Sequence, residues 1–430
     1  MPVEVNHPSS ELVDHLFRTS AGQMVSHLTR LLGPEHLDLA EEVVQDSLLK
    51  ALQLWPHSGV PDNPAGWLFR VARNAALDAV RHRGLTVEKA PAVTAEILRG
   101  ALPSVNDVTE LEEQLRDDEL RMVLMCCHPL LSPDARAALS LKTVGGFSVR
   151  EIARAFLADE AAISQRLVRA KRQIRELKIR FELPTGRDLV ARLDSSLEVL
   201  YLMFNEGYAA LSGEELVRQE LCREALRLAQ LLAASSVGIP TAAALVALMA
   251  FQAARLPARV DAGGELVLLE DQDRALWDQG LIALGFHHFS MCAEGEAITP
   301  YHVQAAIAAT HARAQNGEDP DWRMILEYYD QLMELGPSPI VALNRAVALS
   351  KVENAAAALS ALDPLAHEPA LKHYYLLPAV RGQMLVQVGD WEAASQCFRE
   401  ALERPCSEPE RRFLQRKQAE CRALTEGPRI

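Results

Sequence analysis

The amino-acid sequence predicts an all-α protein. Hydrophobic residues make up 49% of the 430-residue chain, whereas aromatic residues make up only 5%. Ala and Leu dominate the apolar content, and both favour helices because they lose little side-chain freedom there. Apolar residues also recur at helical spacing over most of the chain. Because the chain is longer than one ordinary domain, we expect several helical domains.

Changes in composition divide the chain into four segments. Residues 8–83 have a helical pattern with one break at Pro56–Pro64. Residues 84–115 lose that pattern and contain Gly84, Pro91, Gly100 and Pro103, which predicts a linker. Residues 116–182 are helical again and end in a strongly basic stretch. Residues 186–430 then form a long extension rich in Ala and Leu.

Charge is distributed unevenly between these segments. The whole chain carries a net charge of -14. Residues 1–182 contain 22 basic and 25 acidic residues, a net of -3, and the remainder therefore carries -11. This balance excludes a uniformly basic nucleic-acid-binding protein. Any nucleic-acid surface should be a local patch within the first 182 residues.

The cysteines and the apolar runs bear on the compartment. Seven cysteines without a CxxC pair predict reduced thiols in a cytoplasm. The first residues lack the basic and apolar regions of a signal peptide. The longest apolar run, Val237–Phe251, is interrupted by Pro240 and is too short to span a bilayer. We therefore expect a cytoplasmic protein without a membrane partner.

A helix-turn-helix is predicted near residue 150. Ser148 and Glu151 have the spacing of a capping box, in which each side chain accepts a hydrogen bond from the backbone of the other. A short helix should follow, then a tight turn at Leu157 and Ala158, with Asp159 as the N-cap of a second helix. In that second helix the apolar residues fall on one face, which should be buried: Ile163, Leu167, Ala170 and Ile174.

The opposite face of the second helix is basic. Residues 164–180 contain seven basic residues and one acid. Most such faces are only solvated, but after a capping box and a short helix this one favours binding in a DNA major groove. Ser164, Gln165 and Arg169 lie near the helix start and are candidates for reading base edges. The phosphate-contact candidates are Arg166, Lys171, Arg172 and Arg175.

The first segment resembles region 2 of extracytoplasmic-function (ECF) sigma factors. Residues 38–47, DLAEEVVQDS, match the acidic motif of that family. By resemblance, this helix would dock on the β′ subunit of core RNA polymerase, with the β subunit also contacted by the factor. Leu39, Val43 and Leu48 should face inward. The residues implied in polymerase binding are Asp38, Glu41, Glu42, Gln45 and Asp46.

A second motif in the same segment strengthens the resemblance. Residues 64–74, PAGWLFRVARN, match the motif that opens and reads the promoter -10 element in this family. On the residues alone, Trp67 is more typical of a helical core than of a wedge between bases. The residues implied in -10 binding are Asn63, Trp67, Arg70, Arg73, Asn74 and Arg81.

The order of motifs extends the resemblance to sigma-70 region 4. An acidic motif, a Pro loop, the PAGWLFRVARN motif, a linker and a helix-turn-helix follow one another in the family's order. The helix-turn-helix at 116–182 would then read the -35 element of promoter DNA. The family's turn usually carries Gly, where this chain has Leu157. The resemblance implies a transcription initiation factor that is not an enzyme and needs no cofactor or metal.

The extension resembles that of a sigma-factor subgroup with tetratricopeptide (TPR) repeats. Residues 371–405 place small residues and one Phe as a TPR repeat of about 34 residues requires: Gly382, Gly389, Ala394, Phe398 and Ala401. A degenerate repeat is predicted at 337–366 and a further helix pair near Trp322, which together would make a helical solenoid. We expect this extension to regulate the factor in place of an anti-sigma protein, in response to a protein or small-molecule signal.

Two segments match the same subgroup without a role that we can derive. They are Tyr201–Tyr208 and Arg259–Arg274. An enzyme or sensor would use Glu206, Asp261, Asp271 and the pair His287-His288 as a carboxylate–imidazole site. We instead expect these groups to cap helices and to pair with Arg259 and Arg274, because no metal or triad spacing is present.

Cys126-Cys127-His128 invites a zinc or redox interpretation. Neighbouring residues on a helix point about 100° apart, so the two thiols cannot easily bind one ion. We expect the packed start of a helix before Pro129. A second function class also stays open, a TPR scaffold that keeps a sigma-like half for binding DNA or polymerase without initiating transcription.

Overall fold

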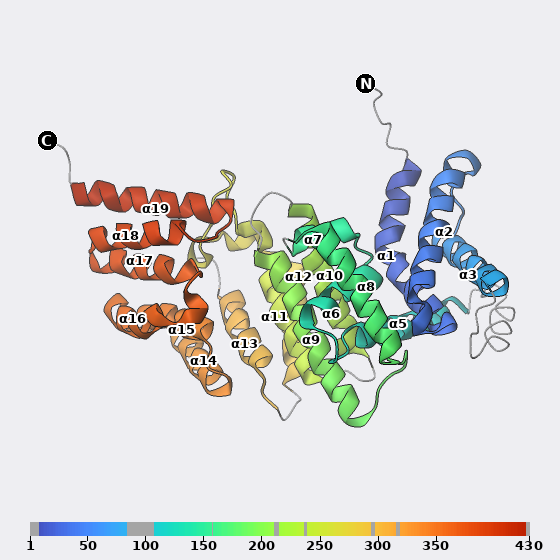
Figure 1. Ribbon diagram of the computed structural model, residues 1–430. Coiled ribbons are helices and arrows are strands. Elements are labelled where there is room, and N and C mark those ends of the chain that lie inside the picture. The colour runs from blue at the N-terminus through green and yellow to red at the C-terminus, as the bar shows by residue number, and fades with distance from the viewer. Residues whose placement is uncertain are drawn as a thin grey trace, which may run out of the picture. The chain divides into compact units, whose positions relative to one another are not determined.

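A computed structural model describes the chain as α-helices joined by turns and short 3-10 helices (Figure 1). Within the described residues no β-strand occurs, and the one β-bridge is an isolated pair, Val260 with Leu266. The all-α prediction is therefore confirmed. Two compact units divide the chain, Met1–Met203 and Phe204–Ile430. The structure describes residues 8–83, 107–156, 158–209, 215–235, 239–293, 297–314 and 319–426.

The first unit begins with a three-helix bundle. Its helices are α1 (Pro8–Leu32), α2 (Leu37–Ser58) and α3 (Pro64–Arg83). Each packs against the other two, and their shared interior includes Leu28, Val43, Leu48, Leu68 and Ala72, all less than 6% exposed. The apolar stripe of α2 thus faces inward as predicted, and its acidic face points away from the bundle.

The bundle is followed by the helices that build the predicted helix-turn-helix. They are α5 (Asp107–Cys126), α6 (Pro133–Thr143), α7 (Val149–Ala155) and α8 (Glu160–Glu176). Residues 107–115, which we expected in the linker, are the first turns of α5. The rest of the predicted linker, residues 84–106, lies outside the described residues, as does Leu157 in the predicted turn.

The local signals of the helix-turn-helix hold with one exception. The capping box is present: Ser148 N donates to Glu151 Oε2 at 2.7 Å, and Glu151 N donates to Ser148 Oγ at 3.2 Å. Asp159 does occupy the N-cap of α8, but its side chain makes no capping hydrogen bond. The stripe on α8 is buried as predicted: Ile163, Leu167, Ala170 and Ile174.

A further helix, α9 (Gly186–Ala209), begins where we placed the start of the extension. Its first turns nevertheless belong to the first unit. Ser195 Oγ donates a hydrogen bond to the backbone oxygen of Cys127, and Glu198 lies 3.7 Å from Arg136 of α6. The predicted boundary near residue 186 is therefore too early, because residues 186–203 pack on the helix-turn-helix.

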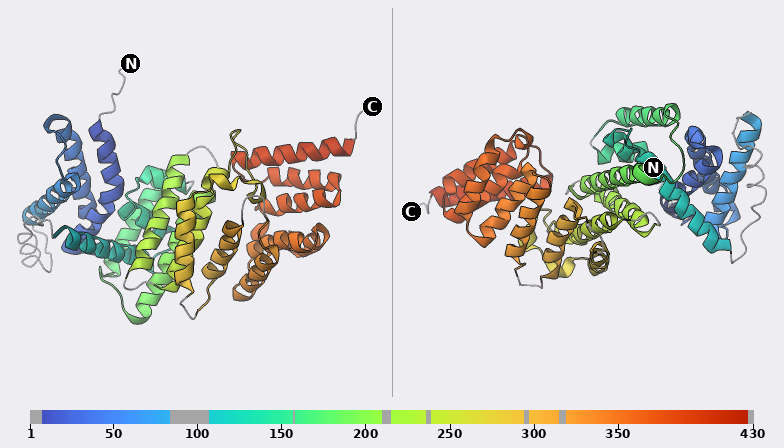
Figure 2. Two further views of the ribbon diagram at one scale, coloured as in Figure 1. Left: turned by 180° about the vertical axis from the view of Figure 1, so that it is seen from behind. Right: turned by 90° about the horizontal axis from the view of Figure 1, so that it is seen from below.

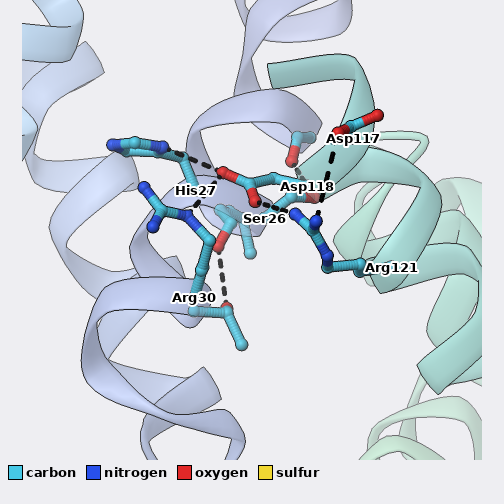
Figure 3. A network of polar contacts seen from close by, with 9 residues as sticks. Ser26, His27, Arg30, Asp117, Asp118 and Arg121 are labelled. Carbon is cyan, nitrogen blue, oxygen red and sulfur yellow. Dashed lines mark hydrogen bonds and ion pairs between the residues drawn. The ribbon is translucent and has the colours of Figure 1, made fainter. Parts of the chain in front are cut away.

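A buried carboxylate joins the bundle to α5 (Figure 3). Asp118 on α5 is 1% exposed. Its Oδ2 lies 3.0 Å from both His27 Nδ1 and Arg30 Nε of α1, and its Oδ1 lies 2.9 Å from Arg121 Nη1. A buried carboxylate is tolerated only where charged donors surround it. This network fixes α1 against α5.

The second unit contains a helix that is apolar on all sides, α11 (Pro240–Ala254). By length and composition the stretch Pro240–Ala258 could cross a membrane, but 72% of it is buried inside the structure. Most of its contacts are with α10, α12 and α13, so it behaves as a core helix. These neighbours are α10 (Glu215–Ala234), α12 (Gln279–Cys292) and α13 (Pro300–Arg313).

The rest of the second unit consists of helices that pack mainly on their sequence neighbours. Within it, α17, α18 and α19 lie side by side (Figures 1 and 2). Phe398 of α18 is 1% exposed, and a Cβ added to Gly382 of α17 would lie only 3.0 Å from the Phe398 ring. Gly389 ends α17 with φ +81°, in the left-handed region. These features fit the predicted packing, while the repeat assignment and the solenoid stay predictions.

The bounds of these last helices agree with the helix pairs expected from the sequence. Asn354 caps α16 through a 2.9 Å hydrogen bond from Ala357 N, at the start of the Ala-rich helix that we predicted at 354–362. The helices are α14 (Trp322–Leu335), α15 (Pro339–Val352), α16 (Ala355–Leu362), α17 (Leu376–Val388), α18 (Trp391–Leu402) and α19 (Glu408–Glu426).

Candidate nucleic-acid interface

The acidic helix α2 presents its predicted partner-binding residues on one face. Asp38, Glu42, Gln45 and Asp46 are exposed, and Glu41 is half-buried. The helix starts directly after a short 3-10 turn, Pro34–His36, so Asp38 lies in its first turn, where the helix dipole favours a negative charge. The side chains that the sequence predicted are therefore gathered on one surface.

The basic helix α8 meets this acidic face. Lys171 Nζ lies 2.8 Å from Asp38 Oδ1 and 2.8 Å from Glu41 Oε2. Arg175 Nη1 lies 3.0 Å from Asp38 Oδ2. We call these three contacts the α2–α8 ion pairs. They join residues that we predicted to bind two different partners, polymerase and DNA.

The environment strengthens the α2–α8 ion pairs. The side chains of Lys171 and Glu41 are each 11% exposed, so water screens their pairing less than that of a surface pair. Burial favours a neutral Asp38, but Lys171 and Arg175 outweigh it and lower the pKa of Asp38 below its usual 3.8. Burial also opposes the charge on Lys171, but Glu41 and Asp38 raise the pKa of Lys171 above 10.5.

These shifts set the pH range over which the pairs persist. The lowered pKa of Asp38 means that its contribution is present above pH 3.8 and is lost as the pH falls through the lower folded value. The raised pKa of Lys171 means that its contribution is present below pH 10.5 and is lost only as the pH rises through the higher folded value. Both groups therefore stay charged around neutral pH, where the pairs yield to competing charges rather than to protons.

The other predicted DNA-binding residues of α8 divide into two groups. Arg166 lies 3.4 Å from Asp134 of α6, and Arg172 lies 2.6 Å from Glu176 on its own helix. By contrast Ser164, Gln165 and Arg169 are exposed and make no hydrogen bond or ion pair within the described part of the chain. The candidates for base readout are thus accessible, whereas the phosphate-contact candidates are paired with acids.

The residues predicted to read the -10 element lie along the start and one face of α3. Asn63 caps this helix, because its Oδ1 accepts from Gly66 N at 2.8 Å. Arg70 and Asn74 are exposed one turn apart. Trp67 is half-buried and packs edge-on against Trp55, with ring centres 5.5 Å apart, as a core residue does.

The last two members of this group are Arg73 and Arg81. Burial lowers the pKa of the half-buried Arg73. The side chain of Arg81 lies outside the described residues. Among the side chains that the structure describes, the exposed candidates for -10 contacts are Arg70, Asn74 and Asn63, the last of which also serves as a helix cap.

The two segments that carry these surfaces match known protein families. Residues 16–86 match the family described as Sigma-70 region 2, and residues 121–174 match Sigma-70, region 4. The chain is an ECF sigma factor of the sigma-70 family. Residues 192–293 of this sigma factor match a family of unknown function, DUF6596. No solved structure matches the chain at a significant level.

The alignments with related proteins span different fractions of this sigma factor. An uncharacterized protein of Rhizobium meliloti (strain 1021) is 42% identical, over 85% of this chain and 86% of the relative. The ECF RNA polymerase sigma factor SigE of Mycolicibacterium smegmatis is 29% identical, over 38% of this chain and 60% of its own length. Probable ECF RNA polymerase sigma factor SigI of Mycobacterium tuberculosis is 26% identical, over 44% and 67%. The likeness to named sigma factors thus covers less than half of the chain.

Sigma factors are not enzymes, and one of the side chains considered for an enzymatic site, Asp261, is engaged in a turn. Asp261 Oδ1 accepts from the backbone N of Glu265 at 2.9 Å. We expected Arg274 to pair with an acid, but within the described part of the chain it forms no ion pair and donates to the backbone oxygens of His311 and Ala314. Within the described ranges, no group of three or more His, Cys, Asp or Glu side chains could hold a metal ion.

The adjacent cysteines are structural. Cys126 Sγ lies 3.2 Å from Thr143 Oγ1, and Cys127 Sγ lies 3.4 Å from Ser140 Oγ. Burial raises the pKa of both thiols, which disfavours the reactive thiolate. The expected helix start before Pro129 is wrong, because α5 ends at Cys126. Pro129 was the available signal, because helices usually end at or before the residue that precedes a proline.

Two features of the first unit were not predicted from the sequence. One is the pairing between α2 and α8, although the opposite charges of the two helices were visible. The other is the Asp118 network, whose partner His27 lies 91 positions away. Charge patterns show which faces are complementary, but they do not show which residues meet over such separations.

Proposed function

We propose that this sigma factor binds core RNA polymerase through the acidic face of α2 and directs it to promoters through α3 and α8. Support comes from the two sigma-70 domains and from the exposed acids on α2. On α3 the proposed -10 contacts include Asn74. On α8 the proposed -35 contacts are Gln165 and Arg169 for base edges, with Lys171 among those for phosphates.

The main structural observation behind this proposal is the set of α2–α8 ion pairs, which occupy both proposed binding surfaces. Asp38 and Glu41 cannot bind the polymerase while they hold Lys171, and Lys171 cannot bind a DNA phosphate while it holds them. We infer that the described arrangement is a closed state of the free factor. Polymerase and promoter DNA would open it together, because each supplies the opposite charge to one half of the pairs.

The extension is proposed to regulate this opening in place of an anti-sigma protein. Its net charge of about -11 and its DUF6596 segment support a specialised role. A protein or a small molecule would supply the signal, and TPR-like helix pairs suit protein binding. Because residues 186–203 belong to the first unit, a test by truncation should cut after Ala209, the end of α9, rather than near Pro184.

Substitution of Asn74 and Arg169 separates a sigma factor from a scaffold that only retains sigma-like domains. We expect Arg169→Ala to lower initiation at the cognate promoter roughly 10- to 100-fold, because a base contact is worth about 1–3 kcal/mol. Asn74→Ala should lower open-complex formation. The measurement is run-off transcription with purified core polymerase. Unchanged initiation by both variants would favour the scaffold.

Arg172→Ala is the matched control on the same helix. Arg172 is exposed and bonded only to Glu176, and we assign it to phosphates. Its loss should weaken binding to the promoter and to a duplex with an altered -35 element equally. Arg169→Ala should instead reduce the ratio between the affinity for the promoter and the affinity for the altered duplex. If both variants show the same ratio of affinities, Arg169 does not read a base.

A further inference from the structure

Two arginines of the second unit, Arg255 and Arg274, lie over the ring of Trp277, and a third, Arg259, is close enough to interact electrostatically with Arg255. Arg255 ends α11, and Arg274 begins the 3-10 turn that leads to Trp277. Their Cζ atoms lie 5.8 Å and 5.1 Å from the centre of the Trp277 ring. Arg259 lies one 3-10 turn after Arg255, with its Cζ 4.0 Å from the centre of the Tyr208 ring.

The hydrogen-bond partners of these arginines are neutral. Arg255 Nε donates to Gln272 Oε1 at 3.4 Å, and Arg259 donates to the backbone oxygen of Tyr208. Arg274 donates to the backbone oxygens of His311 and Ala314 at 2.6 and 2.7 Å. Among the residues that the structure describes, none of the three arginines forms an ion pair with a carboxylate.

Apart from Asp271, which is exposed and forms no ion pair with the cluster among the described residues, the acids of the same segment are committed elsewhere. Asp261 and Asp273 accept from backbone N–H groups at 2.9 Å. Glu265 pairs with Arg416 at 2.6 Å, and Glu270 pairs with Lys351. Asp319 is near enough to favour the charge on Arg274, yet it makes no ion pair with it. The positive charge of the cluster is therefore left uncompensated by the segment that carries it.

The three arginines are partly buried, and they lie next to the buried side chains of Trp277 and Gln272. Burial lowers the pKa of Arg255, and the charges of Arg259 and Arg274 add to this effect. The neighbouring His311 is 9% exposed, and burial, with Arg255 and Arg274, lowers its pKa to about 4, so it adds no charge at neutral pH. Partly buried cations without a carboxylate partner cost free energy, and a bound anion would offset that cost.

An independent observation also indicates a missing acceptor. Trp277 is 4% exposed, and its buried Nε1 has no hydrogen-bond partner. Buried indole N–H groups usually find an acceptor. The cluster thus combines three guanidinium groups that have no carboxylate partner among the described residues with an unsatisfied N–H donor, and an oxyanion is an acceptor for both kinds of group.

We propose that Arg255, Arg259 and Arg274 form a binding site for the phosphate group of a small molecule. Guanidinium groups bind phosphate through paired hydrogen bonds. Three positive charges suit a group that carries close to two negative charges better than they suit a single carboxylate. The site gives a role to both segments of unassigned function, since Tyr208 comes from the first and Gln272 from the second.

The test is phosphate binding by the full-length chain, measured by isothermal titration calorimetry and thermal denaturation. Inorganic phosphate is the probe, with chloride and acetate at equal ionic strength as references. We expect phosphate to raise the melting midpoint by about 5 °C near saturation, and acetate not to. A folded wild-type chain that shows no phosphate-specific binding, or an equal response to acetate, overturns the proposal.

Variants locate the site and separate it from a structural role. Arg255→Met should abolish the phosphate response without lowering the midpoint in chloride, because it relieves repulsion among like charges. Arg274→Gln should weaken phosphate binding at least tenfold and serves as the second variant if the first does not fold. Arg422→Met, at an exposed position of α19, is the matched control and should respond as the wild type does. An unchanged phosphate response in both cluster variants contradicts the assignment.

Discussion

Asp38→Asn combined with Glu41→Gln is expected to raise the affinity of the free factor for duplex DNA carrying its -35 element by about tenfold. The closed state reduces the apparent affinity by the fraction of molecules that are open. Without the two carboxylates, Lys171 and Arg175 become available to phosphates. Fluorescence anisotropy with a labelled duplex measures this change, and the gain should shrink as salt screens the ion pairs.

The same double variant should bind core polymerase more weakly, because Asp38 and Glu41 are proposed polymerase contacts. Opposite changes in the two assays distinguish a masked surface from a general loss of structure. The matched control for the DNA assay is Glu35→Gln with Asp46→Asn, which removes the same charge from exposed positions nearby. Because Asp46 is itself a proposed polymerase contact, this control applies to the DNA assay alone. If the control gains as much DNA affinity as the double variant, net charge explains the effect and the α2–α8 ion pairs do not.

Asp118→Asn is expected to lower the free energy that holds α1 against α5 by about 2–3 kcal/mol. The amide keeps the shape of the side chain but leaves Arg30 and Arg121 facing a neutral group in a buried place. The side chains of both arginines are more than a quarter exposed, so solvent reduces the free-energy cost of the substitution. Hydrogen exchange followed by mass spectrometry on peptides from α1 and α5 measures this local opening.

The neighbouring residue provides the control for this prediction. Asp117 is 64% exposed and lies 4.0 Å from Arg121, so Asp117→Asn should change the exchange of the same peptides by less than about 0.5 kcal/mol. Equal effects of the two substitutions would mean that burial of Asp118 does not matter. No change with Asp118→Asn would mean that apolar packing alone holds α1 to α5.

Local signals in the sequence predicted local structure well. The capping box of Ser148 and Glu151 and the buried stripe of α8 depend on spacings of three or four residues, which helix geometry imposes directly. The inward face of α2 follows from the same rule. The family resemblance rested on the order of short motifs, and the matches to regions 2 and 4 confirm it.

Features that depend on long-range packing were not predictable in the same way. Lys171 and Asp38 are 133 positions apart, and no spacing rule connects them. The boundary of the extension was misplaced because the helical pattern of α9 continues across it, while contacts such as Ser195 with Cys127 decide which unit its turns join. The arginine cluster around Trp277 also arises only when α11 and the 3-10 turns beyond it fold together.

Zero-length carbodiimide crosslinking of Lys171 to Asp38 or Glu41 tests the closed state most directly. This reagent joins an amine to a carboxylate only where the two are in contact, and mass spectrometry identifies the joined peptides. In the free factor we predict a Lys171 crosslink to Glu41 or Asp38, its loss when core polymerase and promoter DNA are added before the reagent, and no initiation by the crosslinked fraction. Absence of the crosslink in the free factor, or normal initiation by crosslinked molecules, would contradict the account.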